Sequence, residues 1–274
     1  MRYVLCDVFT ERALAGKPLA VFTDARGLEA EALQALAREM GLSETAFVLP
    51  PKQGGHARLR IFTPSAELSY AAHPTLGAAF VLAGPLQALE LRLELEVGVI
   101  PVRLEREAAR ISFAWMQAPK TSRIVCEAAN AVLQALGVRS EVPCQAYESG
   151  GQRLLVSLPS AAHLAALRPD LAALSQATAA GVYAFHFDGK GCTARYFAPR
   201  AGVNEDPATG SAAASLALYL REQGRLAPTD ILRIDQGAEI GRPSTLYAQV
   251  GGGEDPHVEV GGAARIVARG QFTL

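Results

Sequence analysis

Hydrophobic and polar positions along the chain follow the periods of both strands and helices. Residues 91–97 read Leu-Arg-Leu-Glu-Leu-Glu-Val, and this alternation predicts a strand with one buried and one solvated face. Residues 28–40 place apolar side chains on one helical face, and Gly41 follows where a left-handed helix cap is favoured. Further strands are predicted at residues 3–8, 18–22, 46–49, 58–63, 99–104, 111–115, 154–158, 182–187, 231–235, 246–250, 258–260 and 266–268, and further helices at 74–83 and 126–136. Short strands joined by antiparallel turns, with a helix in each half, predict the α+β class.

The stretch from Arg195 to Leu220 combines a strand, a polar loop and an Ala/Leu-rich helix. Its loop, residues 204–211, reads Asn-Glu-Asp-Pro-Ala-Thr-Gly-Ser. A strand that passes through such a turn into a helix aims several N–H groups at one point, and the helix dipole adds positive charge there. We therefore expect Gly210 and Ser211 to offer backbone N–H groups to a carboxylate. A plain capping turn is the simpler alternative.

The same design occurs once more, between Arg60 and Gly84. The first copy holds Arg60, Phe62, Pro64, Ala66, His73-Pro74 and Gly77, which recur in order as Arg195, Phe197, Pro199, Ala201, Asp206-Pro207 and Gly210. Two copies predict two similar domains, with an active site in the cleft between them. The alternative is a chance likeness between two Pro/Gly turns that precede Ala-rich helices.

Composition restricts the class of protein further. At 274 residues and 50% hydrophobic, the chain can bury a core in each of two domains, and its net charge of -1 favours neither nucleic acid nor an anionic membrane. Its cysteines, Cys6, Cys126, Cys144 and Cys192, are too widely spaced to indicate a zinc site or a disulfide framework. The chain shows no secretory signal, no bilayer-length apolar stretch, no HExxH and no nucleotide-binding motif. We expect a cytoplasmic protein that binds no metal.

Three residues are candidates for chemistry. Glu44 lies at the mouth of an apolar strand, where partial desolvation favours a carboxyl group that can take and return a proton. An exposed turn glutamate is the plainer interpretation on the residues alone. His73 can donate to a substrate carboxylate or assist proton transfer, although a loop histidine is more often a structural hydrogen bonder. Asp206 can orient His73 or polarise a substrate group, or it can simply cap the helix.

An ordered set of motifs resembles one family. It comprises Asp7-x-Phe9-Thr10, Gly16-Lys17-Pro18, Ser43-Glu44-Thr45-Ala46-Phe47, Glu67-Leu68, His73-Pro74-Thr75-Leu76-Gly77, the loop at 204–211, Gln236-Gly237, Gly241-Arg242-Pro243-Ser244 and Val260-Gly261-Gly262. The chain resembles the PhzF-like phenazine-biosynthesis isomerases, members of the diaminopimelate epimerase fold superfamily. The resemblance covers nearly the whole chain.

The resemblance implies an architecture. Two α+β domains of diaminopimelate epimerase-like fold, related by a pseudo-twofold axis, would each wrap a β-barrel-like sheet around a central helix. The N-terminal domain would span residues 1–117, with the final strand at 264–274 packing back onto it, and the C-terminal domain would span 118–263. A proline-containing segment near mid-chain, residues 117–121, agrees with this crossing. Relatives are typically homodimers that need no cofactor.

The resemblance also implies a function, an isomerase that moves a proton between carbons of a small carboxylate-bearing metabolite. Glu44 would be the general acid/base, with His73 and Asp206 as the other catalytic residues. The substrate-binding positions would be Ala72, Thr75, Gly210 and Ser211. This chain has Ala72 where the family usually has Gly, and Lys17 where it typically has Asn.

Three further functions are weighed against this one. Racemases of the superfamily use a cysteine in each site loop, and neither loop here contains one, which excludes a two-thiol mechanism. A non-catalytic small-molecule binding module on the same scaffold remains an alternative. An epimerase that uses Glu44 and His73 as opposed bases is the other.

Overall fold

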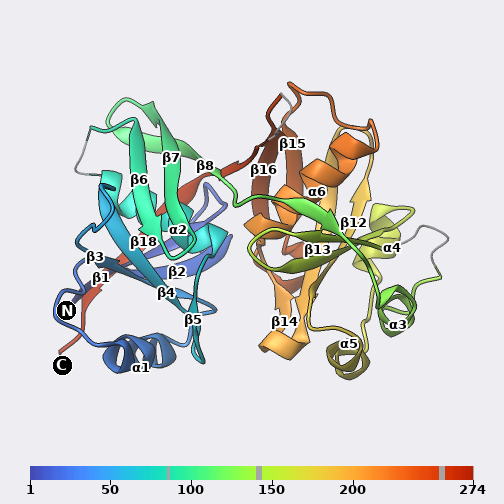
Figure 1. Cartoon of the computed structure of the whole chain (residues 1–274), viewed down its shortest axis with the longest axis horizontal. Coiled ribbons are helices and arrows are strands. Elements are labelled where there is room, and N and C mark those ends of the chain that lie inside the picture. The colour runs from blue at the N-terminus through green and yellow to red at the C-terminus, as the bar shows by residue number, and fades with distance from the viewer. Residues whose placement is uncertain (85–86, 140–143, 253–256, 274) are drawn as a thin grey trace. The chain divides into compact units, whose positions relative to one another are not determined.

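A computed structural model describes residues 1–84, 87–139, 144–252 and 257–273. The chain forms two compact units, Met1–Gln117 with Gly261–Leu274 (unit 1) and Ala118–Val260 (unit 2). Figure 1 shows that both units combine strands with helices, which confirms the α+β class. That these units are the two expected epimerase-like domains stays a prediction. Among the described helices, none has both the length and the apolar character of a bilayer span.

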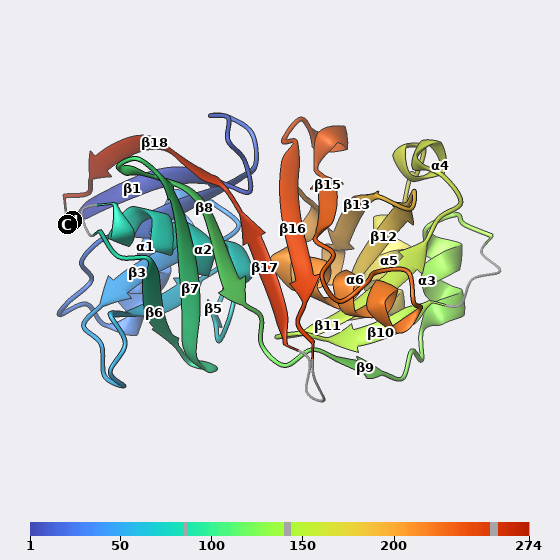
Figure 2. The ribbon, with the colours of Figure 1, turned by 90° about the horizontal axis from the view of Figure 1, so that it is seen from above.

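Unit 1 is a curved run of strands around a helix. Its strands are β1 (Arg2–Val8), β2 (Lys17–Phe22), β3 (Thr45–Leu49), β4 (Ala57–Phe62), β5 (Glu67–Leu68), β6 (Glu90–Leu95), β7 (Gly98–Glu107), β8 (Arg110–Gln117) and β18 (Ala264–Gln271). They pair in the order β18-β1-β2-β3-β4-β6-β7-β8, with β5 on β4. Helix α2 (Ala72–Ala83) contacts β18 and β8 as well as strands between them, so the sheet curves around it (Figure 2).

Helix α2 is apolar on every side, as its central position requires. A Cβ atom at Gly77 would lie 2.5 Å from Leu19 Cδ2 and 2.8 Å from Val8 Cγ2, so only glycine allows this close packing on β1 and β2. The helix begins at Ala72, two residues before the expected start, and Pro74 still falls in its first turn. Helix α1 (Ala30–Met40) is amphipathic and packs on β3 and β4, and Gly41 caps it with φ of 62°, as predicted.

Unit 2 repeats the strand pairing of unit 1. Its strands are β9 (Ser122–Ile124), β10 (Gln145–Glu148), β11 (Gln152–Ser157), β12 (Gly181–Phe187), β13 (Gly191–Ala198), β14 (Val203–Asp206), β15 (Leu232–Gln236) and β16 (Ser244–Val250), and β17 (Val258–Gly262) runs across the unit boundary. Six strand pairs of unit 1 have counterparts in unit 2, each with the same parallel or antiparallel sense. In chain order, β1–β2, β2–β3, β3–β4, β4–β5, β4–β6 and β6–β7 correspond to β10–β11, β11–β12, β12–β13, β13–β14, β13–β15 and β15–β16. This correspondence supports the internal repeat over a chance likeness.

The helices of unit 2 are α3 (Ala129–Ala135), α4 (Ala161–Ala165), α5 (Leu171–Ala177) and α6 (Gly210–Glu222), with 3-10 turns η1 (Pro199–Ala201) and η2 (Ala238–Ile240). Helix α6 follows β14 as α2 follows β5, and it packs on β11 and β16. Helix α3 is shorter than the expected 126–136.

Two local predictions were wrong. The site loops were expected to be irregular, but each contains a short strand, β5 or β14, that pairs back on the strand before it. Glu94 was expected on the solvated face of its strand, but it is buried. Its carboxylate accepts hydrogen bonds from the backbone N–H groups of Lys52 at 2.6 Å, Gln53 at 2.6 Å and Gly55 at 2.8 Å, which replace the lost hydration.

Candidate active site

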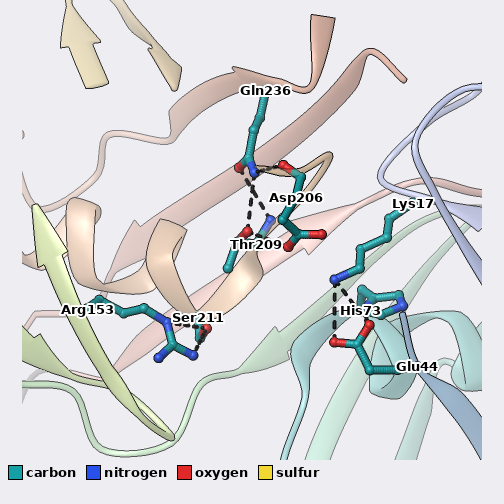
Figure 3. Close-up of polar contacts among 8 residues, drawn as sticks. All are labelled: Lys17, Glu44, His73, Arg153, Asp206, Thr209, Ser211 and Gln236. Atoms are coloured by element: carbon teal, nitrogen blue, oxygen red, sulfur yellow. Dashed lines mark hydrogen bonds and ion pairs between the residues drawn. The ribbon is translucent and has the colours of Figure 1, made fainter. Parts of the chain in front are cut away.

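Three ionisable side chains of unit 1 meet at Glu44. Glu44 lies just before β3, Lys17 is the first residue of β2, and His73 lies in the first turn of α2. Lys17 Nζ is 3.2 Å from Glu44 Oε2 and 3.4 Å from Oε1, and His73 Nδ1 is 3.8 Å from Oε2 (Figure 3). The side chains of Lys17, Glu44 and His73 are only 6%, 15% and 3% exposed. Burying a charge is unfavourable unless it is paired, and Lys17 and Glu44 pair here.

A tight turn delivers Lys17 to this position. Asp7 accepts a hydrogen bond from the Leu14 N–H at 2.7 Å, which ties the loop back to β1. Gly16 has φ of +67°, and a Cβ atom there would collide with the Val8 carbonyl and the Thr10 side chain. The Asp7 and Gly16 motifs therefore have a shared structural role, because together they shape the loop that precedes β2.

The first turn of α2 carries the other predicted residues of unit 1. Ala72 and Thr75 are both buried beside His73. The Thr75 hydroxyl donates to the Ala71 carbonyl at 2.8 Å, so in this structure it stabilises the start of the helix. Substrate binding by Ala72 and Thr75 stays a prediction.

A neutral hydrogen-bond chain holds Asp206 in unit 2. The Thr209 hydroxyl donates to Asp206 Oδ2 at 2.6 Å. Gln236 Nε2 donates to the Asp206 carbonyl at 2.7 Å and to Thr209 Oγ1 at 3.2 Å (Figure 3). Gln236 Oε1 accepts from the Thr209 N–H at 3.3 Å and from the Tyr183 hydroxyl at 3.0 Å.

The groups at the two ends of this hydrogen-bond chain determine which of its members donate and which accept. A carbonyl can only accept and a backbone N–H can only donate, so Asp206 and Thr209 fix which way the Gln236 amide points. Tyr183 must then donate its proton. Burial raises the pKa of the Tyr183 hydroxyl well above its ordinary value, and nearby groups that include Asp206 raise it further, which keeps that donor protonated. The Asp206 carboxylate is thus held in one orientation.

Gly237 lets this loop pack closely. Its φ is +81°, and a Cβ atom there would lie 2.7 Å from the Pro207 carbonyl oxygen and 2.9 Å from Pro207 Cα. The Gln236-Gly237 pair therefore supports the 204–211 loop in two ways, by hydrogen bonds from Gln236 and by close approach at Gly237.

The start of α6 offers donors to an anion. The N–H groups of Ala212 and Ala213 both donate to the Thr209 carbonyl, whereas those of Gly210 and Ser211 precede them, where a helix provides no intrahelical acceptor. Arg153 donates to Ser211 Oγ from Nε at 3.2 Å and from Nη2 at 2.8 Å (Figure 3). Both lone pairs of that oxygen are then engaged, so the Ser211 hydroxyl is left to donate.

Sequence reasoning found some of these residues and missed others. The structure brings Glu44 and His73 together in unit 1, and it places Asp206, Gly210 and Ser211 on one loop and helix start in unit 2. The sequence alone did not mark four other residues of the site, which are Lys17, Arg153, Thr209 and Gln236. A lysine at the start of an apolar strand was a signal for Lys17, but the other three needed tertiary pairing. Glu205, on the same loop as Asp206, pairs with Arg195.

The cysteines are poor candidates for acid–base chemistry. All four are free thiols, and burial, aided by the charge of Asp7, raises the pKa of Cys6 to about 12. Burial likewise raises the pKa of Cys192 well above its ordinary value. Over the described ranges, no group of three or more His, Cys, Asp or Glu side chains is arranged to hold a metal ion.

Comparisons with known proteins agree with this architecture. Residues 6–270 match the family described as phenazine biosynthesis-like protein. The chain is 41% identical to the trans-2,3-dihydro-3-hydroxyanthranilate isomerase of Pseudomonas aeruginosa, over 100% of this chain and 99% of that protein. It also resembles the solved structure of a predicted epimerase from Pseudomonas aeruginosa, with 34% identity, a TM-score of 0.85 and coverage of 100% and 99% of the two chains.

A more distant likeness concerns the fold alone. A probable proline racemase from Agrobacterium radiobacter matches with a TM-score of 0.66 at 11% identity, covering 100% of this chain and 93% of that one. Together with the closer structural match, it confirms the epimerase-like fold class.

Proposed function

Because the chain belongs to the phenazine biosynthesis-like protein family and is an isomerase, we propose that it moves a proton between two carbons of a small carboxylate-bearing metabolite. Glu44 is the general acid and base of this reaction. The observation that carries the proposal is the buried contact of the Glu44 carboxylate with Lys17 and His73. That contact places the Glu44 carboxyl group in a largely desolvated position beside two basic side chains, within reach of a bound substrate as a general base must be.

One carboxylate is enough for the chemistry. A C–H bond of the substrate breaks, an O–H bond forms on Glu44, and the electron pair remains in the conjugated substrate. The same proton then leaves Glu44 and bonds to a second carbon, which shifts the double bond and restores the carboxylate. Because Glu44 begins and ends ionised, the reaction needs no cofactor.

The other residues bind and orient. His73 and Asp206 polarise substrate groups, and the Gly210 and Ser211 donors bind the substrate carboxylate. The hydrogen bonds from Thr209 and Gln236 support the orientation of Asp206. Ala72 and Thr75 contact the substrate from the start of α2. By similarity to the named relative, the substrate class is a cyclic dihydro-hydroxy acid such as trans-2,3-dihydro-3-hydroxyanthranilate.

The epimerase alternative fits the geometry less well. An epimerase with two bases needs them on opposite faces of one carbon. Glu44 Oε2 and His73 Nδ1 are 3.8 Å apart, which leaves no room for a substrate carbon between them. The distance therefore favours a proton shift by a single base.

The test follows the proton. Wild type and Glu44→Gln would be incubated in D₂O with trans-2,3-dihydro-3-hydroxyanthranilate, and deuterium at carbon would be followed by NMR. We expect turnover and exchange to fall by about 10²–10⁴-fold in Glu44→Gln, the usual contribution of a general base. Glu39→Gln, an exposed glutamate of α1, is the matched control. Turnover retained by Glu44→Gln would refute its role, and saturable binding without exchange by the wild type would favour a binding module.

Family resemblance also leads us to propose a homodimer. Size-exclusion chromatography with light scattering measures the mass of the particle directly. A mass near twice the 28.9 kDa of one chain is the expected result.

A further inference from the structure

Lys17 is a buried cation that lies against the proposed base. Its Nζ is within 3.4 Å of both carboxylate oxygens of Glu44 (Figure 3). The ammonium therefore faces the carboxylate group as a whole rather than one of its edges. A lysine ammonium is strongly hydrated in water, so burying it is unfavourable unless its charge is compensated. Because Lys17 lies at the reacting oxygens, its charge interacts with the negative charge that moves during the reaction.

Negative charge moves during the proposed proton shift. When the carbon-bound proton reaches Glu44, the carboxylate becomes neutral and the substrate becomes an anion. When the proton leaves for the second carbon, the charge returns to Glu44. A fixed positive charge beside this path stabilises the transition state, and its effect is strong where water is excluded.

We propose that Lys17 is a catalytic residue, whose ammonium group pairs with Glu44 at rest and with the substrate anion while Glu44 carries the proton. This inference rests on the proposed function of Glu44. His73 Nδ1 faces the same carboxylate oxygen at 3.8 Å, but an imidazole changes its charge between pH 5 and 8. Lys17 is the closer of the two groups and keeps its charge without forming or breaking a bond.

The first arm of the test separates charge from shape. Lys17→Met removes the charge with little change in side-chain length, and Lys17→Arg keeps the charge. Lys52→Met, at an exposed lysine of unit 1, is the matched control. With trans-2,3-dihydro-3-hydroxyanthranilate, we expect kcat of Lys17→Met to fall about 10²–10³-fold while KM changes less than about threefold.

The arginine variant distinguishes a counter-charge from a proton donor. Lys17→Arg should recover at least about tenfold of the loss in kcat, because guanidinium keeps the charge but does not release a proton. Wild-type kcat in Lys17→Met overturns the proposal. So does a Lys17→Arg variant that is as slow as Lys17→Met.

The second arm needs no turnover. Glu44→Gln places a neutral group at position 44, as in the step in which Glu44 carries the proton. The Lys17 charge is then available to an anion, so Glu44→Gln should bind 3-hydroxybenzoate about tenfold more tightly than the Lys17→Met/Glu44→Gln double variant does. Equal affinities, measured by calorimetry, overturn the proposal.

The two arms keep this inference distinct from the proposed function. An inactive wild type would count against the proposed reaction, and the binding comparison would still decide on Lys17. The double variant also removes both partners of the ion pair together. It therefore leaves no buried charge without its partner at this contact, and it avoids the unfolding that Lys17→Met alone risks.

Discussion

Each unit contains the same arginine–glutamate–phenylalanine arrangement, but in different surroundings. In unit 1, Arg60 makes two hydrogen bonds of 2.6 Å to Glu67, and its guanidinium lies 5.1 Å from the Phe62 ring. In unit 2, Arg195 bonds to Glu205 at 2.9 and 2.7 Å and lies 5.1 Å from the ring of Phe197. The same ion pair and the same contact between arginine and an aromatic ring therefore stabilise both hairpins, β4–β5 and β13–β14.

The surroundings give the two arrangements different energies. The side chains of Arg60 and Glu67 are 18% and 37% exposed, whereas those of Arg195 and Glu205 are 7% and 12% exposed. Arg195 also donates to the carbonyls of Leu164 and Leu167. The comparison teaches that a repeated motif preserves geometry, while burial decides how much each copy contributes to stability.

The largest expected effect comes from breaking the buried copy. Arg195→Gln leaves Glu205, whose side chain is only 12% exposed, without its partner and should lower the free energy of unfolding by about 3–5 kcal/mol. Arg60→Gln, at the equivalent and more exposed site, should cost about 0–1 kcal/mol. Urea denaturation followed by circular dichroism measures both. Equal losses would show that burial does not separate the two copies.

The second comparison concerns the contacts at the two candidate sites, which are an ion pair between Lys17 and Glu44 in unit 1 and a chain of hydrogen bonds that holds Asp206 in unit 2. Gln236→Glu keeps the shape of the side chain but replaces its donor with an oxygen that faces the Asp206 carbonyl. We expect a loss of about 2–3 kcal/mol in unfolding free energy, the cost of buried groups left unsatisfied. Gln152→Glu on β11, whose side chain is exposed, is the control. A Gln236→Glu variant as stable as this control would refute the role of these hydrogen bonds in holding Asp206.

The smallest expected effect is a pH dependence that both units share. Burial of the Glu94 carboxyl raises its pKa, but hydrogen bonds from three backbone N–H groups lower it more, so the pKa of Glu94 lies below its ordinary value. In unit 2, the N–H groups of Gly191 and Lys190 lower the pKa of Asp188 in the same way.

A lowered pKa stabilises the folded state above the pKa of the unfolded chain. That stability is lost as the pH falls through the lower, folded value. The thermal midpoints of Glu94→Gln and Asp188→Asn should therefore fall less steeply below about pH 4 than that of the wild type. An unchanged acid slope in both variants would contradict this account.

Much of the fold could be predicted because its signals are local. The Gly41 cap, the amphipathic α1 and the alternating strands each follow from spacing within a few residues. The repeated Arg-x-Phe-x-Pro-x-Ala motif also predicts the two-copy design from the sequence alone. The burial of Glu94 could not be predicted, because its partners lie in another loop about forty positions earlier in the chain.

The candidate site likewise contains residues with local sequence signals and residues whose partners are distant in sequence. Glu44, His73 and Asp206 stand in recognisable motifs, so the sequence marked them. Lys17 and Gln236 act through partners that are distant in sequence, and no local pattern shows that a lysine will reach a glutamate just before the next strand. Alternation predicts which face a residue occupies, but not which side chain it will meet there.

The pairing of β18 with β1 has a consequence for synthesis. β1 lies between β2 and β18, yet β18 leaves the ribosome only after the whole of unit 2. Unit 2 is continuous in sequence, so it can complete its strand pairing while unit 1 still exposes one side of β1. During translation, the usual order in which N-terminal domains fold first is therefore reversed at the final step. The nascent chain carries an open sheet edge for as long as unit 2 is being made, a period in which a chaperone would have its main opportunity to bind.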